Sequence, residues 1–255
     1  MKFKNQIDQK SPINHDDFLQ IIENFETTGE ILDDRGRNKV KYFTVKEHEI
    51  NTKSFKIPNF INKIAYKFIR KSKAQRSFEH ANFLLKNGIG TPIPYAYYEF
   101  SSPFGFNKSY YFSKQFTFDF SYHKLVDEPD YPDHENILRQ FTQFTFKLHE
   151  NGIYFKDHSP GNTLIVKNGE QYNFYLIDLN RMDFITYDFD SRMKNFSRLT
   201  TQKEMIRVMS DEYAKLINKP FEIVYSKMLE ETNNFQKKYI RRTKLKKWYS
   251  GIKKQ

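Results

Sequence analysis

The sequence predicts an α+β fold of two lobes, with strands gathered in the first lobe and helices in the second. Short segments of alternating or aromatic-rich character, bounded by turn-forming residues, account for about five strands before residue 117. From residue 134 onward, longer stretches carry helical periodicity. Because the connections are short, we expect one domain over 1–255, with an N-lobe of about 1–116, a C-lobe of about 117–255 and a nucleotide bound between them.

The first lobe contains three predicted helices and the predicted strands. The first helix covers 14–26 and the third covers 74–86. The second covers 58–70, where apolar residues recur at spacings of one, three and four while lysines and arginines lie on the other side. The strands are expected at 30–33, 40–45, 49–55, 95–100 and 109–116.

The second lobe is predicted to be mainly helical, with helices over 135–151, 201–219 and 222–249. A compact segment over 153–185 separates the first two of these helices and is expected to contain two short strands.

The composition excludes several classes of protein. With 26 Phe and 17 Tyr among 255 residues, the chain can bury a large core, which excludes wholesale disorder. The absence of Cys excludes disulfides, a cysteine-based zinc site and a thiol nucleophile. The charged start of the sequence predicts no secretory signal. Nor does any stretch reach the roughly 18 to 20 apolar residues that a membrane-spanning helix needs.

The net charge of +11 comes from 42 Lys and Arg against 31 Asp and Glu, and it is clustered. Residues 51–78 contain eight basic residues and no acid, and the tail over 237–255 contains nine and no acid. Such basic surfaces suit phosphate-rich partners, although a uniformly basic solvated surface is the alternative.

The residues that best indicate a chemistry are two aspartates and an asparagine. Asp157 follows a short apolar piece, Asn162 comes five residues later, and Asp178 ends an apolar strand. Phosphoryl transfer needs a carboxylate to orient the attacking hydroxyl and oxygen ligands to hold Mg²⁺ against the phosphates. The three residues match the spacing of these groups in protein kinases.

The sequence around these residues resembles the bacterial lipopolysaccharide kinase family, which includes Kdo kinases and core heptose kinases and has the protein-kinase-like fold. The resemblance covers about residues 29–200. It implies that ATP is the phosphate donor, that Asp157 is the catalytic base, and that Asn162 and Asp178 bind Mg²⁺. Lys156 and His158, beside Asp157, are candidates for contact with the substrate. The most similar stretches are His149–Ile153, Lys156–Asn162 and Leu176–Met182.

The resemblance continues upstream, with two departures. Lys53 resembles the lysine that binds the α- and β-phosphates, with Lys56 as the competing candidate, and Glu79 resembles the helix acid that pairs with this lysine. Phe155 stands where protein kinases have His, and we expect it to keep an apolar packing role. The turn over 33–37 has a single Gly, so the identity of the nucleotide loop stays open.

Two basic segments indicate a partner surface. The helix over 58–70 has the apolar and cationic faces of an interfacial membrane helix, or else packs on the core with a solvated basic face. The run over 237–249 mixes aromatics and cations and could bind anionic glycolipid, membrane or RNA, or else be a solvated tail. No RNA-binding signature is present, so we expect no nucleic-acid partner.

The leading hypothesis is a kinase for a sugar of the lipopolysaccharide inner core, acting on Kdo-lipid A or core. We expect it to work at the anionic, cytoplasmic face of the inner membrane as a peripheral protein. Kdo is favoured over heptose because the chain is short and lacks insertions. The alternatives are a kinase for another small molecule or a protein, although nothing after Asp178 resembles an Ala-Pro-Glu segment, and a pseudokinase scaffold that binds nucleotide or membrane.

Overall fold

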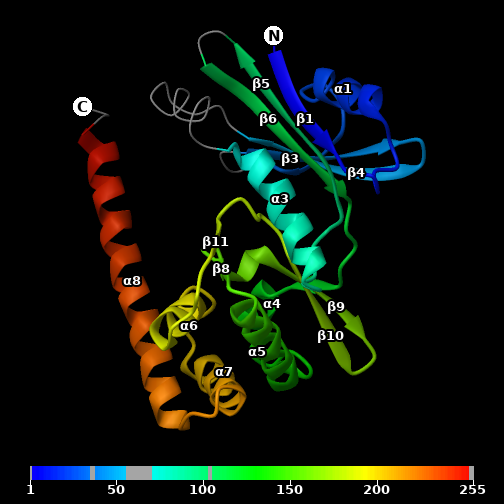
Figure 1. Ribbon diagram of the computed structural model, residues 1–255. Coiled ribbons are helices and arrows are strands. Elements are labelled where there is room, and N and C mark those ends of the chain that lie inside the picture. Colours follow the sequence, from blue (N-terminus) through cyan, green and yellow to red (C-terminus); the bar gives the residue numbers. More distant parts are fainter. Residues whose placement is uncertain (1, 35–37, 56–70, 103–104, 253–255) are drawn as a thin grey trace. The chain divides into compact units, whose positions relative to one another are not determined.

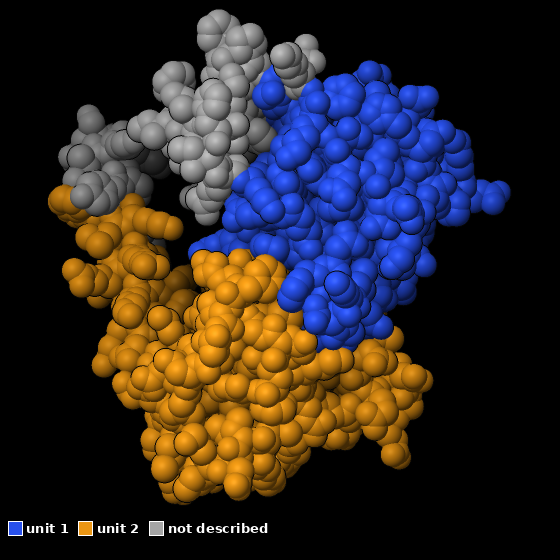
Figure 2. Space-filling view, in the orientation of Figure 1, with its two compact units in different colours: residues 1–117, 175–181 blue, residues 118–174, 182–255 orange. Residues whose placement is uncertain are grey.

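A computed structural model describes residues 2–34, 38–55, 71–102 and 105–252. The contacts divide the chain into two compact units, which Figure 2 colours separately. Unit 1 comprises Met1–Thr117 and Tyr175–Arg181, and unit 2 comprises Phe118–Phe174 and Met182–Gln255. The short segment that contains Asp178 therefore packs with the first part of the chain, although it follows the strands of unit 2 in sequence.

Unit 1 is built on a six-stranded antiparallel sheet with the order β1-β5-β6-β4-β3-β2. Five of these strands confirm the sequence predictions. The edge strand β1 was not predicted, and it pairs with β5 from Lys2 opposite Ser101 to Ile7 opposite Ala96. The strands are β1 (Lys2–Ile7), β2 (Glu30–Asp33), β3 (Asn38–Val45), β4 (His48–Phe55), β5 (Pro94–Ser102) and β6 (Gly105–Lys114).

Different helices cover the two faces of this sheet (Figure 1), because successive residues of a strand point to opposite faces. Helix α1 (His15–Glu23) packs on the face that carries Tyr98, and helix α3 (Lys73–Lys86) packs on the face that carries Phe55 and Tyr97. Both helices confirm their predictions, except that α1 ends earlier than expected. The predicted helix over 58–70 lies outside the described residues.

Side-chain caps define where both helices begin. The Asn14 side chain accepts a hydrogen bond from the backbone of Asp17, whose carboxylate accepts one from the backbone of Asn14. The Ser72 hydroxyl accepts from the backbone N–H of Gln75 at the start of α3. Each cap satisfies amide groups that the first helical turn leaves unpaired.

Unit 2 packs helices around a core to which α5 contributes Leu138 and Phe141, both fully buried. Two small sheets accompany the helices, one with the order β10-β9-β7 and one with the order β11-β8. The helices are α4 (His123–Asp127), α5 (His134–Glu150), α6 (Phe189–Phe196), α7 (Lys203–Leu216) and α8 (Phe221–Ile252), with a 3₁₀ turn at Pro160–Asn162. The strands are β7 (Phe120–Ser121), β8 (Ile153–Phe155), β9 (Thr163–Asn168), β10 (Gln171–Leu176) and β11 (Met182–Phe184).

The segment over 153–185 differs from its prediction, because it contains four strands rather than two. The two extra strands, β8 and β11, have three residues each and pair with one another, with Met182 opposite Phe155. Strands this short carry no detectable periodicity, and only their long-range pairing reveals them. Helices α4 and α6 are also short and were not predicted.

Helix α8 changes character along its length. Its first half is anchored in the core by Val224, Met228 and Thr232, which recur at a spacing of four. From Lys237 onward, nearly every described side chain is exposed. Among the residues that the structure describes, no helix combines the length and the apolarity needed to cross a membrane.

Candidate active site

Lys53 lies in the interior of the unit 1 sheet, on β4, and forms an ion pair with Asp178 of the same unit. Its Nζ lies 2.7 Å from Asp178 Oδ1, and the two side chains are 15% and 34% exposed. The ammonium also lies over the ring of Phe55, 5.5 Å from its centroid. The competing candidate Lys56 lies outside the described residues, so the choice between the two lysines stays a prediction.

The segment around Asp178 is held in place by backbone hydrogen bonds. Leu176 N–H donates to the Gly90 carbonyl at 2.9 Å, and the Thr91 hydroxyl donates to the Leu176 carbonyl at 2.8 Å. Asp178 itself has φ +58°, a left-handed conformation that is strained for a residue with a side chain. The Asn180 amide donates to Asp178 Oδ1 at 2.5 Å. Strain that neighbouring bonds maintain is typical of functional sites.

His80, which sequence reasoning did not select, ties α3 to this segment. Its Nδ1 donates to the Leu179 carbonyl at 2.6 Å, and the side chain is buried. Burial lowers the pKa of His80, the Leu179 bond opposes that shift, and the ring stays neutral near pH 7. The family resemblance selected the neighbouring residue Glu79. No local sequence pattern indicates the hydrogen bond between His80 and Leu179.

The expected pairing of Glu79 with Lys53 is not found among the described residues, and the alternative partner Lys56 lies outside them. The Glu79 carboxylate accepts hydrogen bonds from Lys71, at 3.0 and 2.8 Å, and from Gln75, at 2.9 Å. Among the described residues, Lys53 makes its ion pair with Asp178 instead. Gln75 lies one helical turn before Glu79, and Lys71 just before the helix, so both reach its carboxylate without crossing the sheet.

In unit 2, Asp157 and Asn162 belong to one tight loop between β8 and β9. Asn162 Nδ2 donates to the Asp157 backbone carbonyl at 2.8 Å and to the Ser159 hydroxyl at 3.3 Å. With both bonds made by the nitrogen, the side-chain oxygen of Asn162 has no hydrogen bond among the described residues. The Asp157 side chain is 14% exposed. The five-residue spacing thus places an available amide oxygen beside the predicted base.

Arg198 contacts this loop and was not selected from the sequence. Its Nη1 donates to Asp157 Oδ1 at 2.7 Å and to the Lys156 carbonyl at 2.5 Å. Its guanidinium lies over the ring of Phe235 on α8, 5.5 Å from the centroid. Arg198 follows α6 and is distant in sequence from Asp157, so no local motif identifies it.

A series of hydrogen bonds between buried polar groups supports the strand that leads into the loop. Phe155 is fully buried, as expected for an apolar packing role, and its carbonyl accepts from Asn195 at 2.9 Å. Asn195 in turn bonds His149 at 3.2 Å, and the other ring nitrogen of His149 bonds the Tyr213 hydroxyl at 2.6 Å. Burial lowers the pKa of His149 to about 3, which suits a structural role.

The two candidates for substrate contact differ. His158 is 1% exposed and packs between the rings of Phe141 and Phe155, at 5.4 and 5.9 Å between centroids. Burial lowers its pKa to about 3. A side chain enclosed in this way has no surface to offer a substrate, so that expectation is corrected. Lys156 is exposed and forms an ion pair with Asp183, and it remains a candidate.

The donor set fits Mg²⁺. The two predicted ligands, the Asp178 carboxylate and the Asn162 side-chain amide, each offer an oxygen atom. Mg²⁺ prefers such oxygen donors and completes its shell with water and phosphate oxygens. A dedicated metal cage is a different arrangement, and the described residues contain no group of three or more His, Cys, Asp or Glu that could form one.

Comparisons with known proteins identify the family and the fold. The profile described as lipopolysaccharide kinase (Kdo/WaaP) family matches residues 27–219. A solved structure described as WaaP in complex with acyl carrier protein is similar with a TM-score of 0.63 and 11% sequence identity, over 93% of this chain and 98% of that chain. At this identity the structural likeness shows the fold alone, and it confirms the predicted fold class. A search of curated proteins finds no match.

Proposed function

We propose that a Kdo hydroxyl is the phosphate acceptor of this chain, which belongs to the lipopolysaccharide kinase (Kdo/WaaP) family. Membership makes the chain an ATP-dependent phosphotransferase that acts on a sugar hydroxyl of lipopolysaccharide. The family description names Kdo and does not separate it from heptose as the acceptor. Kdo is the acceptor that the sequence analysis favours, and a core heptose is the second candidate.

The observation that carries the proposal is the 2.7 Å ion pair between Lys53 and Asp178. The two residues were selected from separate motifs, one as a phosphate-binding cation and the other as a metal ligand. A site for a magnesium nucleotide needs both kinds of group close together. Their meeting in unit 1 supports the binding of ATP phosphates there.

In unit 2, Asp157 is the proposed base. As the acceptor oxygen forms its bond to the γ-phosphorus and the bond to ADP breaks, the hydroxyl proton moves to the Asp157 carboxylate. Asn162 holds the backbone of Asp157 through the 2.8 Å bond to its carbonyl, so the carboxylate keeps one orientation. Mg²⁺, when bound by Asn162 and Asp178, would neutralise charge on the phosphate oxygens.

Transfer of label from γ-labelled ATP tests this reaction. Purified protein is incubated with Mg²⁺ and either Kdo-lipid A or heptose-bearing core, and the glycolipid is then counted. We expect label in Kdo-lipid A. Asp157→Asn should lower the rate by roughly 100-fold or more, since it removes the base while keeping the shape. The matched control is Asp127→Asn, at an exposed site on α4 of the same unit.

The possible outcomes separate the alternatives. Label only in heptose-bearing core would replace Kdo by heptose. No label in either glycolipid, with ATP still bound, would favour another acceptor or a pseudokinase scaffold. If the wild-type protein bound no nucleotide at all, the hypothesis that it is a kinase would be contradicted.

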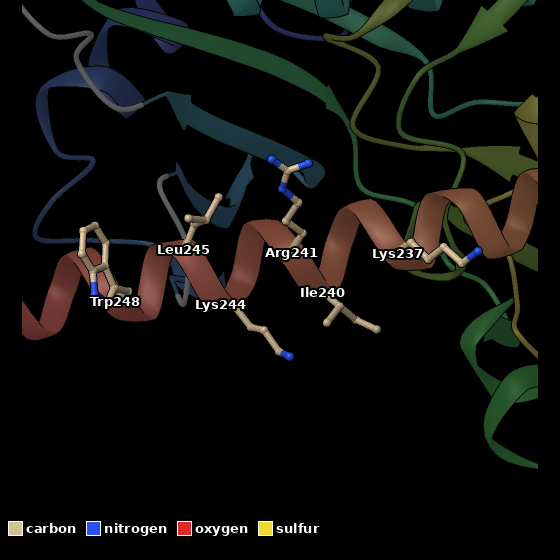
Figure 3. Close-up of a pocket in the computed structure, with 6 residues that line it drawn as sticks. All are labelled: Lys237, Ile240, Arg241, Lys244, Leu245 and Trp248. Atoms are coloured by element: carbon tan, nitrogen blue, oxygen red, sulfur yellow. The ribbon is translucent and has the colours of Figure 1, made fainter.

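A peripheral position on the cytoplasmic face of the inner membrane is part of the same proposal. The exposed part of α8, from Lys237 onward, supports this position. Six of its side chains line a surface pocket (Figure 3), and Ile240, Leu245 and Trp248 among them are 51%, 47% and 60% exposed. The other three, Lys237, Arg241 and Lys244, lie on the same half of the helix circumference. Apolar side chains beside cations suit the headgroup region of an anionic bilayer.

Two triple variants test the membrane contact with equal changes of charge. In the first, Lys237, Arg241 and Lys244 are replaced by Gln. In the matched control, Lys238, Arg242 and Lys246 on the other side are replaced by Gln. At about 1 kcal/mol per basic residue near the surface, the first variant should bind anionic phosphatidylglycerol vesicles about 100-fold more weakly.

The control should change vesicle binding less than the pocket-side variant, and neutral phosphatidylcholine vesicles should bind neither protein tightly. Equal losses in both variants would contradict an oriented contact. The similar solved structure contains acyl carrier protein, so this carrier is the alternative partner. If the first variant lost binding to acyl carrier protein but kept its binding to vesicles, the surface that lines the pocket would be assigned to the carrier.

A further inference from the structure

We propose that Arg198 is a positioning residue for the catalytic step, holding the Asp157 carboxylate in the orientation that accepts the acceptor proton. This inference rests on the proposed function, because it gives Asp157 the role of base. No motif or comparison assigns a role to Arg198. It lies just after α6, and all the contacts that carry the argument fall within unit 2.

The bonds of Arg198 reach a side chain and a main-chain group of adjacent residues. One nitrogen, Nη1, donates to Asp157 Oδ1 at 2.7 Å and to the Lys156 carbonyl at 2.5 Å. Because Nη1 donates to both groups, it links the Asp157 carboxylate to the backbone carbonyl of Lys156. Rotation of the Asp157 side chain would break a charge-assisted bond, which is among the stronger bonds in proteins.

The loop itself contains no other cation that could do this from within the motif. Between Asp157 and Asn162 the residues are His, Ser, Pro and Gly, and His158 is buried and neutral. Lys156 points its ammonium at Asp183. Asn162 holds the backbone carbonyl of Asp157, and Arg198 holds its carboxylate, so the two residues divide the positioning of the base between them.

Phe235 limits the movement of Arg198 from the α8 side. The guanidinium lies over its ring, 5.5 Å from the centroid, and the Arg198 side chain is 32% exposed. A guanidinium that lies over an aromatic ring makes a cation–π contact, which adds to the restraint from its two hydrogen bonds. The pair with Asp157 is therefore more than a solvated surface contact, because ring and loop enclose it from two sides.

Steady-state kinetics test the inference. With γ-labelled ATP and Kdo-lipid A, we expect Arg198→Ala to lower kcat by about 10- to 100-fold while KM for ATP stays within about threefold, because a misplaced base slows the chemical step and leaves nucleotide binding intact. Arg198→Lys should recover part of the loss, since an ammonium keeps the charge and can donate to the same oxygens but lacks the planar group that lies over Phe235. Added guanidinium ion should partly restore Arg198→Ala and leave wild type unchanged.

Two further variants complete the test. Phe235→Ala should lower kcat in the same direction, and the Arg198→Ala, Phe235→Ala double variant should be no slower than Arg198→Ala, because both changes act on one guanidinium. Arg207→Ala is the matched control, since Arg207 pairs with Glu204 on the exposed side of α7. Thermal melting of every variant identifies loss of folding.

The outcomes distinguish this inference from the proposed function. Label transfer by wild type with an unchanged kcat in Arg198→Ala would overturn the positioning role alone. A lower kcat accompanied by a lower melting temperature and no response to guanidinium would also overturn it, in favour of a structural role. If wild type transfers no label to either glycolipid, the proposed function fails and the role of Arg198 fails with it.

Discussion

The ammonium of Lys53 and the carboxylate of Asp178 form a 2.7 Å ion pair that joins a strand of the unit 1 sheet to a segment from much later in the chain. Both groups have other partners in the proposed reaction, because the lysine would bind phosphate oxygens and the aspartate would bind Mg²⁺. We therefore expect the pair to open when the magnesium nucleotide binds.

Lys53→Ala should lower kcat/KM for ATP by roughly 100-fold or more, because the phosphates lose their fixed cation. The measurement is initial rate against ATP concentration. Lys71→Ala is the matched control, since Lys71 pairs with Glu79 on the exposed side of the same unit, and the expected change is less than about threefold. A large loss in Lys56→Ala with a small loss in Lys53→Ala would reverse the choice of lysine.

Asn162 has two proposed tasks that substitutions can separate. Asn162→Ala removes both the amide donor to the Asp157 carbonyl and the side-chain oxygen, and we expect about a 100-fold loss of activity. Asn162→Asp restores an oxygen ligand, so it should recover part of the rate at high Mg²⁺. A Mg²⁺ titration of each variant checks this, and chelation of Mg²⁺ should abolish transfer.

Asn173→Ala, at an exposed site on β10, is the control and should titrate with Mg²⁺ as wild type does. If Asn162→Asp and Asn162→Ala respond identically to Mg²⁺, the side-chain oxygen is not a ligand and the residue serves only to hold the loop.

Two buried histidines should make the stability of unit 2 depend on pH. Burial lowers the pKa of His149 and of His158 from 6.5 to about 3. The unfolded chain therefore takes up protons below pH 6.5 that the folded chain cannot take up. The stability that the two neutral rings contribute is complete above pH 6.5. It falls toward pH 3 by on the order of 1.4 kcal/mol per pH unit for each histidine.

Urea unfolding at pH 7, 6 and 5 measures this slope. His158→Leu should reduce the slope by about half, because one of the two buried imidazoles is gone, whereas His48→Gln, at the exposed start of β4, should leave it unchanged. A slope that is the same in His158→Leu and in wild type would show that His158 takes up protons in the folded state.

Phe155 should be important for stability rather than for proton transfer. The side chain is fully buried where protein kinases have His, so Phe155→Ala should lower the free energy of unfolding by about 3 to 5 kcal/mol. Phe118→Ala is the matched control, because Phe118 is 44% exposed, and we expect a change of less than about 1 kcal/mol. Equal losses in the two variants would contradict a packing role for Phe155.

Features that depend on neighbouring residues could be predicted from the sequence. The helices α3, α5, α7 and α8 were predicted from the sequence, and five strands of the unit 1 sheet appeared between turn signals. The relation between Asp157 and Asn162 is also local, since the loop that joins them is closed by a bond across five residues. The resemblance to the family rested on such local stretches.

Features that depend on distant residues were missed or wrong. The edge strand β1 is defined by its pairing with β5, and strands β8 and β11 by their pairing with each other. Glu79 was expected to pair with Lys53 but bonds Lys71 and Gln75. His158 was expected to face a substrate, yet it is buried against two aromatic rings.

The sequence by itself determined the fold class and the family and predicted a catalytic motif, because each is encoded in residue types at short, fixed spacings. Only the tertiary structure decided which charged groups pair, since ion pairs and long-range hydrogen bonds form where folding brings side chains together. The contacts of Lys53 with Asp178, of His80 with Leu179 and of Arg198 with Asp157 belong to this second class. Their partners lie far apart in the chain, and no local pattern specifies the distance that separates them in the folded state.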